Sequence, residues 1–301
     1  MTITALVSAK SCGVTTSALA LTLASSAPSV LAECDPAGGT VRAGYLQSTV
    51  GAGVGLYHLA KAERAGAEEF AHAFASHLWW LDEAGHRKLL PGLTDPGQAA
   101  AMTRTWPTLA EVLHAMSEPP RDEHGYPLEG TQEHDVYIDA GRLALDSGRL
   151  HPVLTPAPLL YQADLVLLTV RGTEQSLSLA RHVIDPLRVE LMERGRCGDS
   201  LGIMLIEDGP YRSHQVAETL KTPVMGVLPF DAEVAALYAQ GGRPPRGYGH
   251  RDLLTHARST ADSLRAIVRH RTTQRDYASR PTHHRMAGVL QRMTDRGRRH
   301  G

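Results

Sequence analysis

Cysteine is scarce in this sequence of 301 residues, which contains only Cys12, Cys34 and Cys197. Three scattered cysteines cannot form the disulfide framework of a small secreted domain, and they suit a reducing compartment. Long apolar runs are also missing, because no stretch approaches the roughly 20 residues that a helix needs to cross a bilayer. We therefore expect a cytoplasmic protein without a transmembrane segment.

The chain has little net charge, a formal value of −1 at pH 7, so its overall charge does not point to nucleic acid. The charge is uneven, however, because residues 265–301 contain ten arginines and two aspartates. The part from Arg275 to Gly301 has few apolar residues, and we expect it to be disordered or transiently helical. It is either a solubilising tail or a contact for nucleic acid, anionic lipid or an acidic partner.

The first 24 residues are typical of a phosphate-binding loop between a strand and a helix. Residues 1–8 are apolar and β-branched, residues 9–16 form a small-residue turn with a glycine and paired threonines, and residues 17–24 are good helix formers. Backbone N–H groups at such a turn and at the helix N-terminus form a site for anions. The alternative is an ordinary strand–helix turn without a ligand.

The loop differs from the usual pattern G-x-x-x-x-G-K-[ST] at the lysine. If Gly13 is the last glycine, Val14 occupies the lysine position, whereas Thr15 and Thr16 keep the hydroxyl positions. Valine donates no hydrogen bond to a phosphate, and one charge-assisted bond contributes about 1.5–3 kcal/mol, or about one to two decades of affinity. Lys10, four residues upstream, is the candidate to compensate for this loss.

The same region loosely resembles a secretory signal, because Lys10 is followed by the small and apolar residues 17–27. An apolar strand precedes the lysine, however, the residues Gly-Val-Thr-Thr interrupt the pattern, and another strand follows at once. We therefore interpret this segment as part of the folded domain.

Strand-like and helix-like segments alternate along the chain as far as residue 271. The pattern predicts strands at residues 1–8, 29–34, 88–92, 134–139, 163–170, 200–206 and 223–228. It predicts helices at residues 17–24, 95–117, 173–193, 213–220 and 252–271, with residues 41–84 mostly helical. This alternation favours an α/β fold, a mainly parallel twisted sheet with helices on both faces. We expect one domain over residues 1–271 and an arginine-rich tail over residues 272–301.

Polar residues stand at the predicted carboxyl ends of these strands, where open parallel sheets bind their ligands. Ser8, Asp35, Asp139 and Asp231 all close or follow a strand. Asp35 beside the phosphate loop is well placed for Mg²⁺ or an attacking water. The alternative is that Asp35 only caps the turn at residues 35–39.

Three further patterns indicate structure rather than a ligand site. Gly51–Gly55 resembles a dinucleotide motif, but no apolar strand precedes it, so we interpret it as a loop or the start of a helix. Trp79 and Trp80 are expected in core or interface packing. Five apolar residues between positions 95 and 117 recur at helical spacing and predict one buried face: Ala99, Met102, Trp106, Leu109 and Leu113.

The order of these pieces resembles the MinD/ParA group of P-loop ATPases, the positioning and partition proteins, over roughly residues 1–270. The likeness is greatest to short, divergent actinobacterial members, some of them linked to septum-site or Tad-pilus functions. The similar stretches are residues 9–16 (deviant Walker A loop), 30–36 (acidic switch strand), 136–141 (Walker B and second switch region), and 205–210 and 227–231 (late strands near the base).

The resemblance implies ATP and Mg²⁺ bound in a homodimer, within a three-layer sandwich. It makes Thr15, Asp35 and Asp139 the metal-site residues, with Asp139 acting through water and Asp35 also orienting the attacking water. Asp35 and Lys10 would be the two catalytic residues. By position, the cofactor-binding residues would be Ser11, Cys12, Gly13, Val14, Thr15, Thr16, Glu207, Pro229, Phe230 and Asp231.

Departures from the family pattern concern the charged residues. The family loop has two lysines, of which Val14 replaces one, and Lys10 matches the other only if the loop is one residue shorter. Proteins of the family have an asparagine at a strand end that contacts adenine, and its position falls near Glu207 in this sequence. A carboxylate cannot make the same hydrogen bonds as the asparagine amide. Of the family's properties, we expect the fold to apply best to this chain and ATP hydrolysis to apply least. Phosphoryl transfer depends on positioning and electrostatics, which the missing lysines would provide.

Three functions are compatible with these features. The first is a weak ATPase that positions a cargo such as a chromosome, a septum or a pilus or secretion machinery. The second is a non-catalytic pseudo-ATPase that acts as a scaffold for protein partners. The third is a partition protein that binds DNA without sequence preference through the basic tail.

Overall fold

The computed structural model describes residues 1–118, 132–196 and 198–279. The chain divides into two compact units, Met1–Leu264 and Arg265–Gly301. The described part of the second unit is helical and belongs to α10 (Asp252–Ser279), whereas the rest of the predicted tail lies outside the described residues. Within the described residues, the search for a helix long and apolar enough to cross a membrane finds none.

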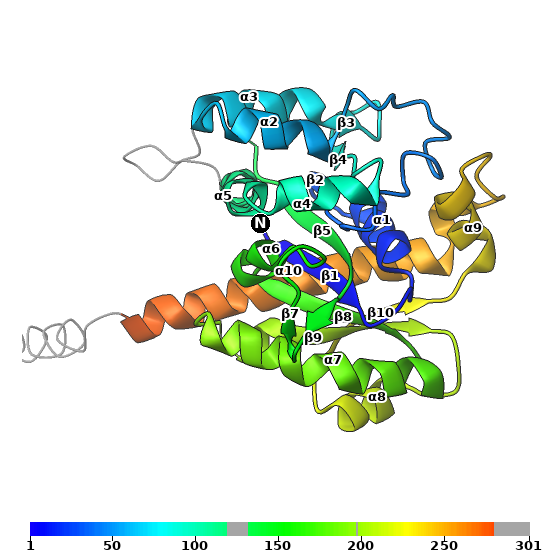
Figure 1. The fold of residues 1–301 in the computed structure, drawn as a ribbon. Coiled ribbons are helices and arrows are strands. Elements are labelled where there is room, and N and C mark those ends of the chain that lie inside the picture. Colours follow the sequence, from blue (N-terminus) through cyan, green and yellow to red (C-terminus); the bar gives the residue numbers. More distant parts are fainter. Residues whose placement is uncertain (119–131, 197, 280–301) are drawn as a thin grey trace, which may run out of the picture. The chain divides into compact units, whose positions relative to one another are not determined.

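The first unit is built on an eight-stranded sheet and a separate two-stranded hairpin (Figure 1). The strands are β1 (Ile3–Ser8), β2 (Ser29–Glu33), β3 (Trp79–Trp80), β4 (Arg87–Leu90), β5 (Asp135–Arg142), β6 (Leu145–Asp146), β7 (Arg149–Leu150), β8 (Leu165–Arg171), β9 (Leu201–Glu207) and β10 (Val224–Pro229). The sheet order is β10-β9-β8-β1-β5-β2-β4-β3, and among these strands only β3 runs antiparallel to its neighbour. The central strands β1 and β8 are almost entirely buried, as expected for a parallel sheet covered on both faces.

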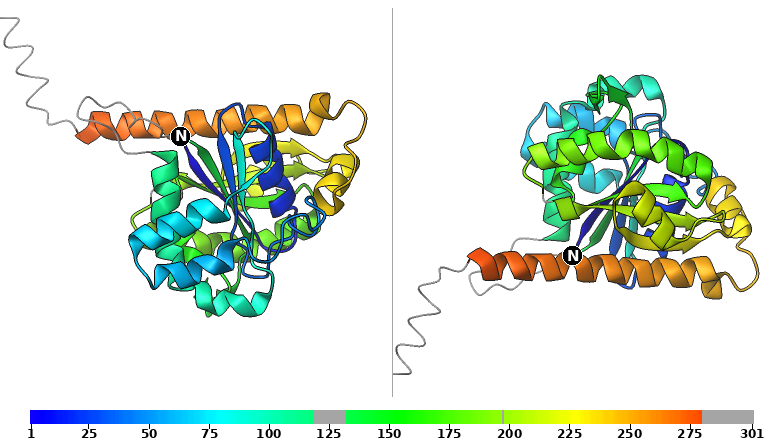
Figure 2. Two further views of the ribbon diagram at one scale, coloured as in Figure 1. Left: turned by 90° about the horizontal axis from the view of Figure 1, so that it is seen from above. Right: turned by 90° about the horizontal axis from the view of Figure 1, so that it is seen from below.

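Helices cover both faces of this sheet (Figure 2). The helices are α1 (Val14–Ala24), α2 (Leu59–Glu63), α3 (Ala67–His77), α4 (Ala99–Met102), α5 (Thr105–Ser117), α6 (Ala157–Gln162), α7 (Glu174–Glu193), α8 (Ser213–Leu220), α9 (Ala232–Gln240) and α10. Short 3-10 turns are η1 (Leu56–His58), η2 (Pro96–Gln98), η3 (Gly198–Ser200) and η4 (Tyr248–His250). The α/β fold class with a mainly parallel sheet is therefore confirmed.

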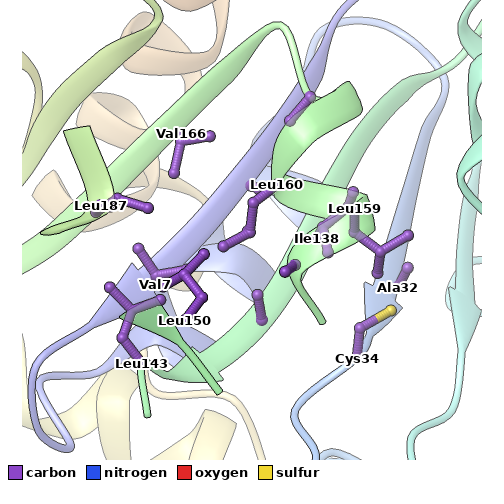
Figure 3. Close-up of a cluster of buried hydrophobic side chains, with 14 of the residues drawn as sticks. Val7, Ala32, Cys34, Ile138, Leu143, Leu150, Leu159, Leu160, Val166 and Leu187 are labelled. Atoms are coloured by element: carbon purple, nitrogen blue, oxygen red, sulfur yellow. The ribbon is translucent and has the colours of Figure 1, made fainter. Parts of the chain in front are cut away.

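A buried hydrophobic cluster lies between the sheet and the layer that contains α6 and α7 (Figure 3), and residues of α5 also belong to it. Ile3, Ala5 and Val7 of β1 belong to it, because alternate residues of a strand point to the same face. Leu6 is also fully buried but points to the opposite face. Two packed layers thus fix the position of β1 and of the turn that follows it.

The prediction that residues 41–84 are mostly helical is wrong. Turns occupy residues 41–55, and only then do η1, α2 and α3 follow. Of the two environments expected for Trp79 and Trp80, core or interface, the structure excludes the core, because they form edge strand β3 with 36% and 55% of their surface exposed. The Lys88 ammonium lies 4.8 Å from the centre of the Trp80 ring, so a cation covers part of this aromatic surface. The Gly51–Gly55 segment is a loop that leads into η1, as predicted.

Several boundaries also differ from the prediction. Helix α1 begins at Val14 instead of Ser17, because Gly13 adopts a left-handed conformation that leads directly into the helix. The helix predicted over residues 95–117 is divided into η2, α4 and α5, although its five predicted face residues are all buried. Strand β5 continues to Arg142, so Asp139 lies within the strand and not at its end. The short elements β6, β7, α6 and α9 were not predicted.

His134 is buried directly before β5, where it contacts a lysine. Its Nδ1–H donates to the carbonyl oxygen of Gln132 at 2.8 Å, so Nε2 accepts from the Lys88 ammonium at 3.2 Å. Burial, together with the Lys88 charge, lowers the pKa of His134 below its ordinary value of 6.5. Burial lowers the pKa of Lys88 as well.

This arrangement predicts a loss of stability in acid. The unfolded chain binds a proton at His134 more readily than the folded chain, so the contribution is complete above pH 6.5 and declines as the pH falls through that value. We expect His134→Asn to lose less unfolding free energy than the wild type between about pH 7 and pH 5 in urea denaturation. The comparison variant is His77→Asn, because burial and the neighbouring His58 lower the pKa of His77, so the difference between the two variants reports the contribution of Lys88. If the unfolding free energies of the wild type and of His134→Asn changed in parallel with pH, the prediction would be contradicted.

Candidate functional site

The turn between β1 and α1 brings backbone N–H groups to the carboxyl edge of the sheet. β1 ends at Ser8, and Gly13, at φ +89°, is the residue before the helix. The N–H groups of a first helical turn have no intrahelical acceptor, and here that turn consists of the uncharged residues 14–17. The positive end of the helix dipole is therefore available to an anion.

Asp139 of β5 lies beside this turn and accepts two hydrogen bonds. The Thr15 hydroxyl donates to Oδ2 at 2.5 Å, and the Gly141 N–H donates to Oδ1 at 3.0 Å. Burial raises the pKa of Asp139 to about 7, the Thr15 bond opposes this shift, and the carboxylates of Glu33 and Asp35 add to it. The site is thus a concentration of buried negative charge next to a positive helix end.

Glu33 places a second carboxylate at this edge, opposite Asp139 in the register of β2 and β5. Its Oε1 accepts from the N–H groups of Thr40 and Val41 at 2.9 Å each, and its Oε2 accepts from Gly92 at 3.0 Å. Burial raises the pKa of Glu33 in spite of these three bonds. Glu33 therefore joins the loops that follow β2 and β4.

Asp35 supplies the third carboxylate. Its Oδ1 accepts from the Ala37 N–H at 2.8 Å, so it caps its own turn as well as facing the cluster. Burial raises its pKa, and the nearby Arg142 opposes the shift. The carboxylate packs directly on Gly141, because a Cβ there would lie 2.0–2.4 Å from the Asp35 carboxyl atoms. Only glycine leaves room for Asp35 in this position.

The three predicted metal-site residues therefore lie close together, but they do not form a complete protein cage. Within the described residues, no group of three His, Cys, Asp or Glu side chains is placed to hold a metal ion. Mg²⁺ differs from most metals because it keeps several waters and takes only one or two protein oxygens. The hydroxyl of Thr15 and the carboxylates of Asp139 and Asp35 are of the oxygen type that it prefers.

A pocket with a cavity volume of about 50 Å³ lies beside the first turn of α1 and opens to solvent. Residues of α1 form one wall, and the end of β10 with the segment after it forms the other. The lining residues are Gly13, Thr16, Ser17, Arg171, Ile206, Leu228, Pro229, Phe230, Asp231, Ala235 and Leu253. Predicted phosphate and adenine residues thus meet in one mainly apolar pocket.

Besides the hydroxyl residues Thr16 and Ser17, the pocket lining has two polar residues, Asp231 and Arg171. Asp231 caps α9, because its Oδ1 accepts from the N–H groups of Glu233 and Val234 at 3.1 Å each. The Arg171 guanidinium lies 5.6 Å from the centre of the half-exposed Phe230 ring. An aromatic face and a cation therefore stand together at the pocket.

Five predicted loop residues lie outside this lining, and one of them is Thr15, which is bonded to Asp139. Lys10 and Ser11 have exposed side chains. Cys12 is buried, with its Sγ 3.6 Å from the Ser176 hydroxyl of α7, and Val14 is buried as well. The loop is therefore held to α7 through Cys12, whereas Lys10 points to solvent.

Glu207 also lies outside the pocket lining, to which the described residues contribute Ile206 and not Glu207. One Glu207 carboxylate oxygen is 3.7 Å from the guanidinium of Arg212. The residue at the end of β9 is thus directed to an ion pair, and the apolar side chain before it faces the pocket.

Some residues of the site were not predicted from the sequence. An acidic residue inside the apolar strand 29–34 was the available signal for Glu33, and a glycine two residues after Asp139 was the signal for Gly141. Arg171 also lines the pocket, and no sequence pattern assigned it to the site. The other lining residues occupy positions that any apolar or small residue could fill: Ser17, Ile206, Ala235 and Leu253.

Comparison with known proteins supports the fold. No family model matches the sequence, and no curated protein matches it. Among solved structures, the chain is similar to MinD of Aquifex aeolicus, with a TM-score of 0.60, 15% identity, and coverage of 88% of this chain and 98% of that chain. It is also similar to MinD of Pyrococcus horikoshii complexed with Mg-ADP, with a TM-score of 0.58, 14% identity, and coverage of 89% and 99%. A ParA family ATPase from Chlorobium tepidum gives a TM-score of 0.55, 12% identity, and coverage of 87% and 98%.

The chain therefore has the fold of the MinD and ParA ATPases over most of its length. At identities of 12–15% this likeness concerns the fold alone. Function has to be argued from the site.

Proposed function

We propose that this chain binds an adenine nucleotide with Mg²⁺ at the carboxyl edge of its sheet and works as a MinD/ParA-like positioning protein. The observation that supports this most directly is the continuity of two sites. Gly13 and Thr16 belong to the helix start that favours an anion and also line the pocket closed by Leu228–Asp231. A nucleotide requires such a joined pair, a phosphate site and an apolar base pocket.

In this proposal each part of the site has a separate role. The N–H groups of residues 13–16 bind the phosphates, and the segment Leu228–Asp231 packs against the base. The Thr15 hydroxyl and, through water, the Asp139 carboxylate would hold Mg²⁺, which would neutralise phosphate charge. Asp35 then orients a water toward the terminal phosphate.

Turnover in this proposal is slow or absent. Val14 supplies no cation to the phosphates, and the exposed Lys10 has to move to reach them. Phosphoryl transfer depends on positioned charge, so the loss of one lysine lowers the rate more than the affinity. The proposal includes a homodimer, in which Lys10 is available to reach the nucleotide of a second copy. The positioning role rests on analogy with proteins of this fold.

A titration of Mg-ATP into the purified protein, followed by calorimetry, tests the proposal. We expect micromolar affinity for the wild type and about tenfold weaker binding for Gly13→Ala, because the added methyl group enters the pocket 3.1 Å from Ile206 Cδ1. The control is Gly195→Ala after α7, whose φ of +74° imposes similar backbone strain, although apart from its chain neighbours no described residue lies within 4 Å of the new Cβ.

Two results would contradict the proposal. The first is that the wild type shows no heat of binding at millimolar nucleotide, and the second is that both alanine variants weaken binding equally. The second result would mean that Gly13 acts through stability and not through the pocket.

A further inference from the structure

The segment after Asp35 packs backbone to backbone against the end of helix α9. We refer to residues 40–48 as the 40–48 segment. A Cβ at Gly44 would lie 2.3 Å from the carbonyl oxygen of Ala239, and a Cβ at Gly241 would lie 2.7 Å from the carbonyl oxygen of Gly44. Two glycines thus allow a contact that side chains would prevent.

A cluster of three tyrosines seals this contact. Tyr45 lies edge to face with Tyr238 of α9, with 5.8 Å between the ring centres, and Tyr238 lies edge to face with Tyr248 at 6.4 Å. The hydroxyls of Tyr238 and Tyr248 are 2.8 Å apart, and burial raises the pKa of all three tyrosines. Edge-to-face pairs with a buried hydrogen bond fix both distance and orientation.

The other end of the 40–48 segment is attached to the carboxylate cluster. Glu33 accepts the N–H groups of Thr40 and Val41, and Asp35 follows two residues later. The turns between these ends are themselves bonded, because the Gly44 N–H donates to the Thr40 carbonyl at 2.8 Å. The 40–48 segment therefore contacts Glu33 at its first residues and α9 through Gly44 and Tyr45.

Helix α9 begins in the pocket. Asp231, which caps the helix, and Ala235 in its first turn both line the pocket, and Tyr238 lies three residues further along the same helix face. A molecule in the pocket contacts the first turn of α9, and the 40–48 segment contacts its last turn.

We propose that the 40–48 segment couples the base pocket to the loop that contains Asp35, so that a base packed against α9 orders this loop. Tyr45, Tyr238 and Tyr248 are positioning residues in this coupling, since they lie outside the pocket. The inference deepens the proposed function and rests on it. It identifies the base, and not only the phosphates, as a ligand that regulates the loop.

Hydrogen exchange of residues 36–54, with and without Mg-ADP, tests the coupling, and calorimetry records binding in the same samples. In the wild type we expect exchange to slow about tenfold on binding. In Tyr45→Leu we expect affinity within about threefold of the wild type but less than about twofold slowing. The matched control is Tyr57→Leu, because Tyr57 is 43% exposed and has its ring contact with His58, outside this cluster. In this control variant, hydrogen exchange of residues 36–54 should slow on Mg-ADP binding as much as it does in the wild type.

A second measurement needs no nucleotide. Asp231→Ala removes the cap of α9, and we expect exchange of the 40–48 segment to rise about fivefold in the wild-type background but not in Tyr45→Leu. Equal increases in both backgrounds, or none, would overturn the coupling.

The two measurements distinguish failure of the inference from failure of the proposed function. ADP binding without slower exchange at residues 36–54 overturns the coupling and leaves nucleotide binding intact. Failure to bind ADP removes the proposed function and the role of the base, whatever the result for Asp231→Ala.

Discussion

Replacing Gly141 with alanine is expected to lower the free energy of unfolding by about 2–4 kcal/mol and to displace Asp35. Gly141 has φ +66°, a conformation that costs alanine about 1 kcal/mol. The new Cβ would lie 2.0 Å from the Asp35 carboxyl carbon, and overpacking of this kind costs a further ~1–3 kcal/mol. Urea denaturation measures the total.

The matched control is Gly148→Ala in the turn between β6 and β7. Gly148 has φ +78°, but among the described residues only Gly148 and its chain neighbours lie within 4 Å of a Cβ there, so only about 1 kcal/mol should be lost. The double variant Gly141→Ala with Asp35→Ala should recover much of the difference, because it removes the atoms that clash. Equal losses for Gly141→Ala and Gly148→Ala would show that Asp35 does not pack on Gly141.

Most of the sheet could be predicted from the sequence, because a parallel sheet covered by two helix layers requires strands that are apolar along their whole length. Residues 163–170 show this clearly, and β8 follows almost the same bounds. The segment at residues 41–84 was wrongly predicted as mostly helical because alanine, glutamate and histidine are compatible with a helix, whereas glycines and long-range contacts determine its loop. The sequence could not decide between core and interface packing for Trp79 and Trp80, since large aromatic residues are usually buried but also occur at edges, and their exposure excludes the core.

The candidate site could be predicted only in its general position. The rule that ligands bind at the carboxyl edge of a parallel sheet brought Asp35, Asp139 and Asp231 to one region. The side-chain contacts could not be derived in the same way, because they depend on register and on loop paths. Asp231 illustrates this point, since its own carboxylate is occupied in capping α9 while the residue lines the pocket.

Glu33 gives the second large effect, because it is a buried acid that no sequence pattern assigned to the site. We expect Glu33→Leu to lower the free energy of unfolding by about 3 kcal/mol or more. Each of three backbone N–H groups would lose its acceptor, and a buried donor without a partner costs about 1–3 kcal/mol. Removal of the buried charge returns part of this loss, since burial already raises the pKa of Glu33.

Glu33→Gln separates hydrogen bonding from charge. An amide oxygen can still accept from Thr40 and Val41, but the amide nitrogen would then face the N–H of Gly92, so we expect an intermediate loss of about 1–2 kcal/mol. The control for locality is Glu190→Leu, which removes another buried glutamate, bonded to Tyr161 at 2.8 Å and remote in sequence from the 40–48 segment. Hydrogen exchange should accelerate at residues 40–54 in Glu33→Leu only.

If Glu33→Leu were as stable as the wild type, Glu33 would not be the residue that holds the loop after β2 at the carboxyl edge of the sheet. Buried ion pairs are sometimes replaced by apolar residues without loss, and the outcome here depends on whether three backbone donors can find water. If they can, the loop after β2 is held by its remaining contacts, among them the glycine and tyrosine contacts with α9. If they cannot, as we expect, Glu33 holds the 40–48 segment beside Asp35, and the same residue that stabilises the fold determines where Asp35 stands.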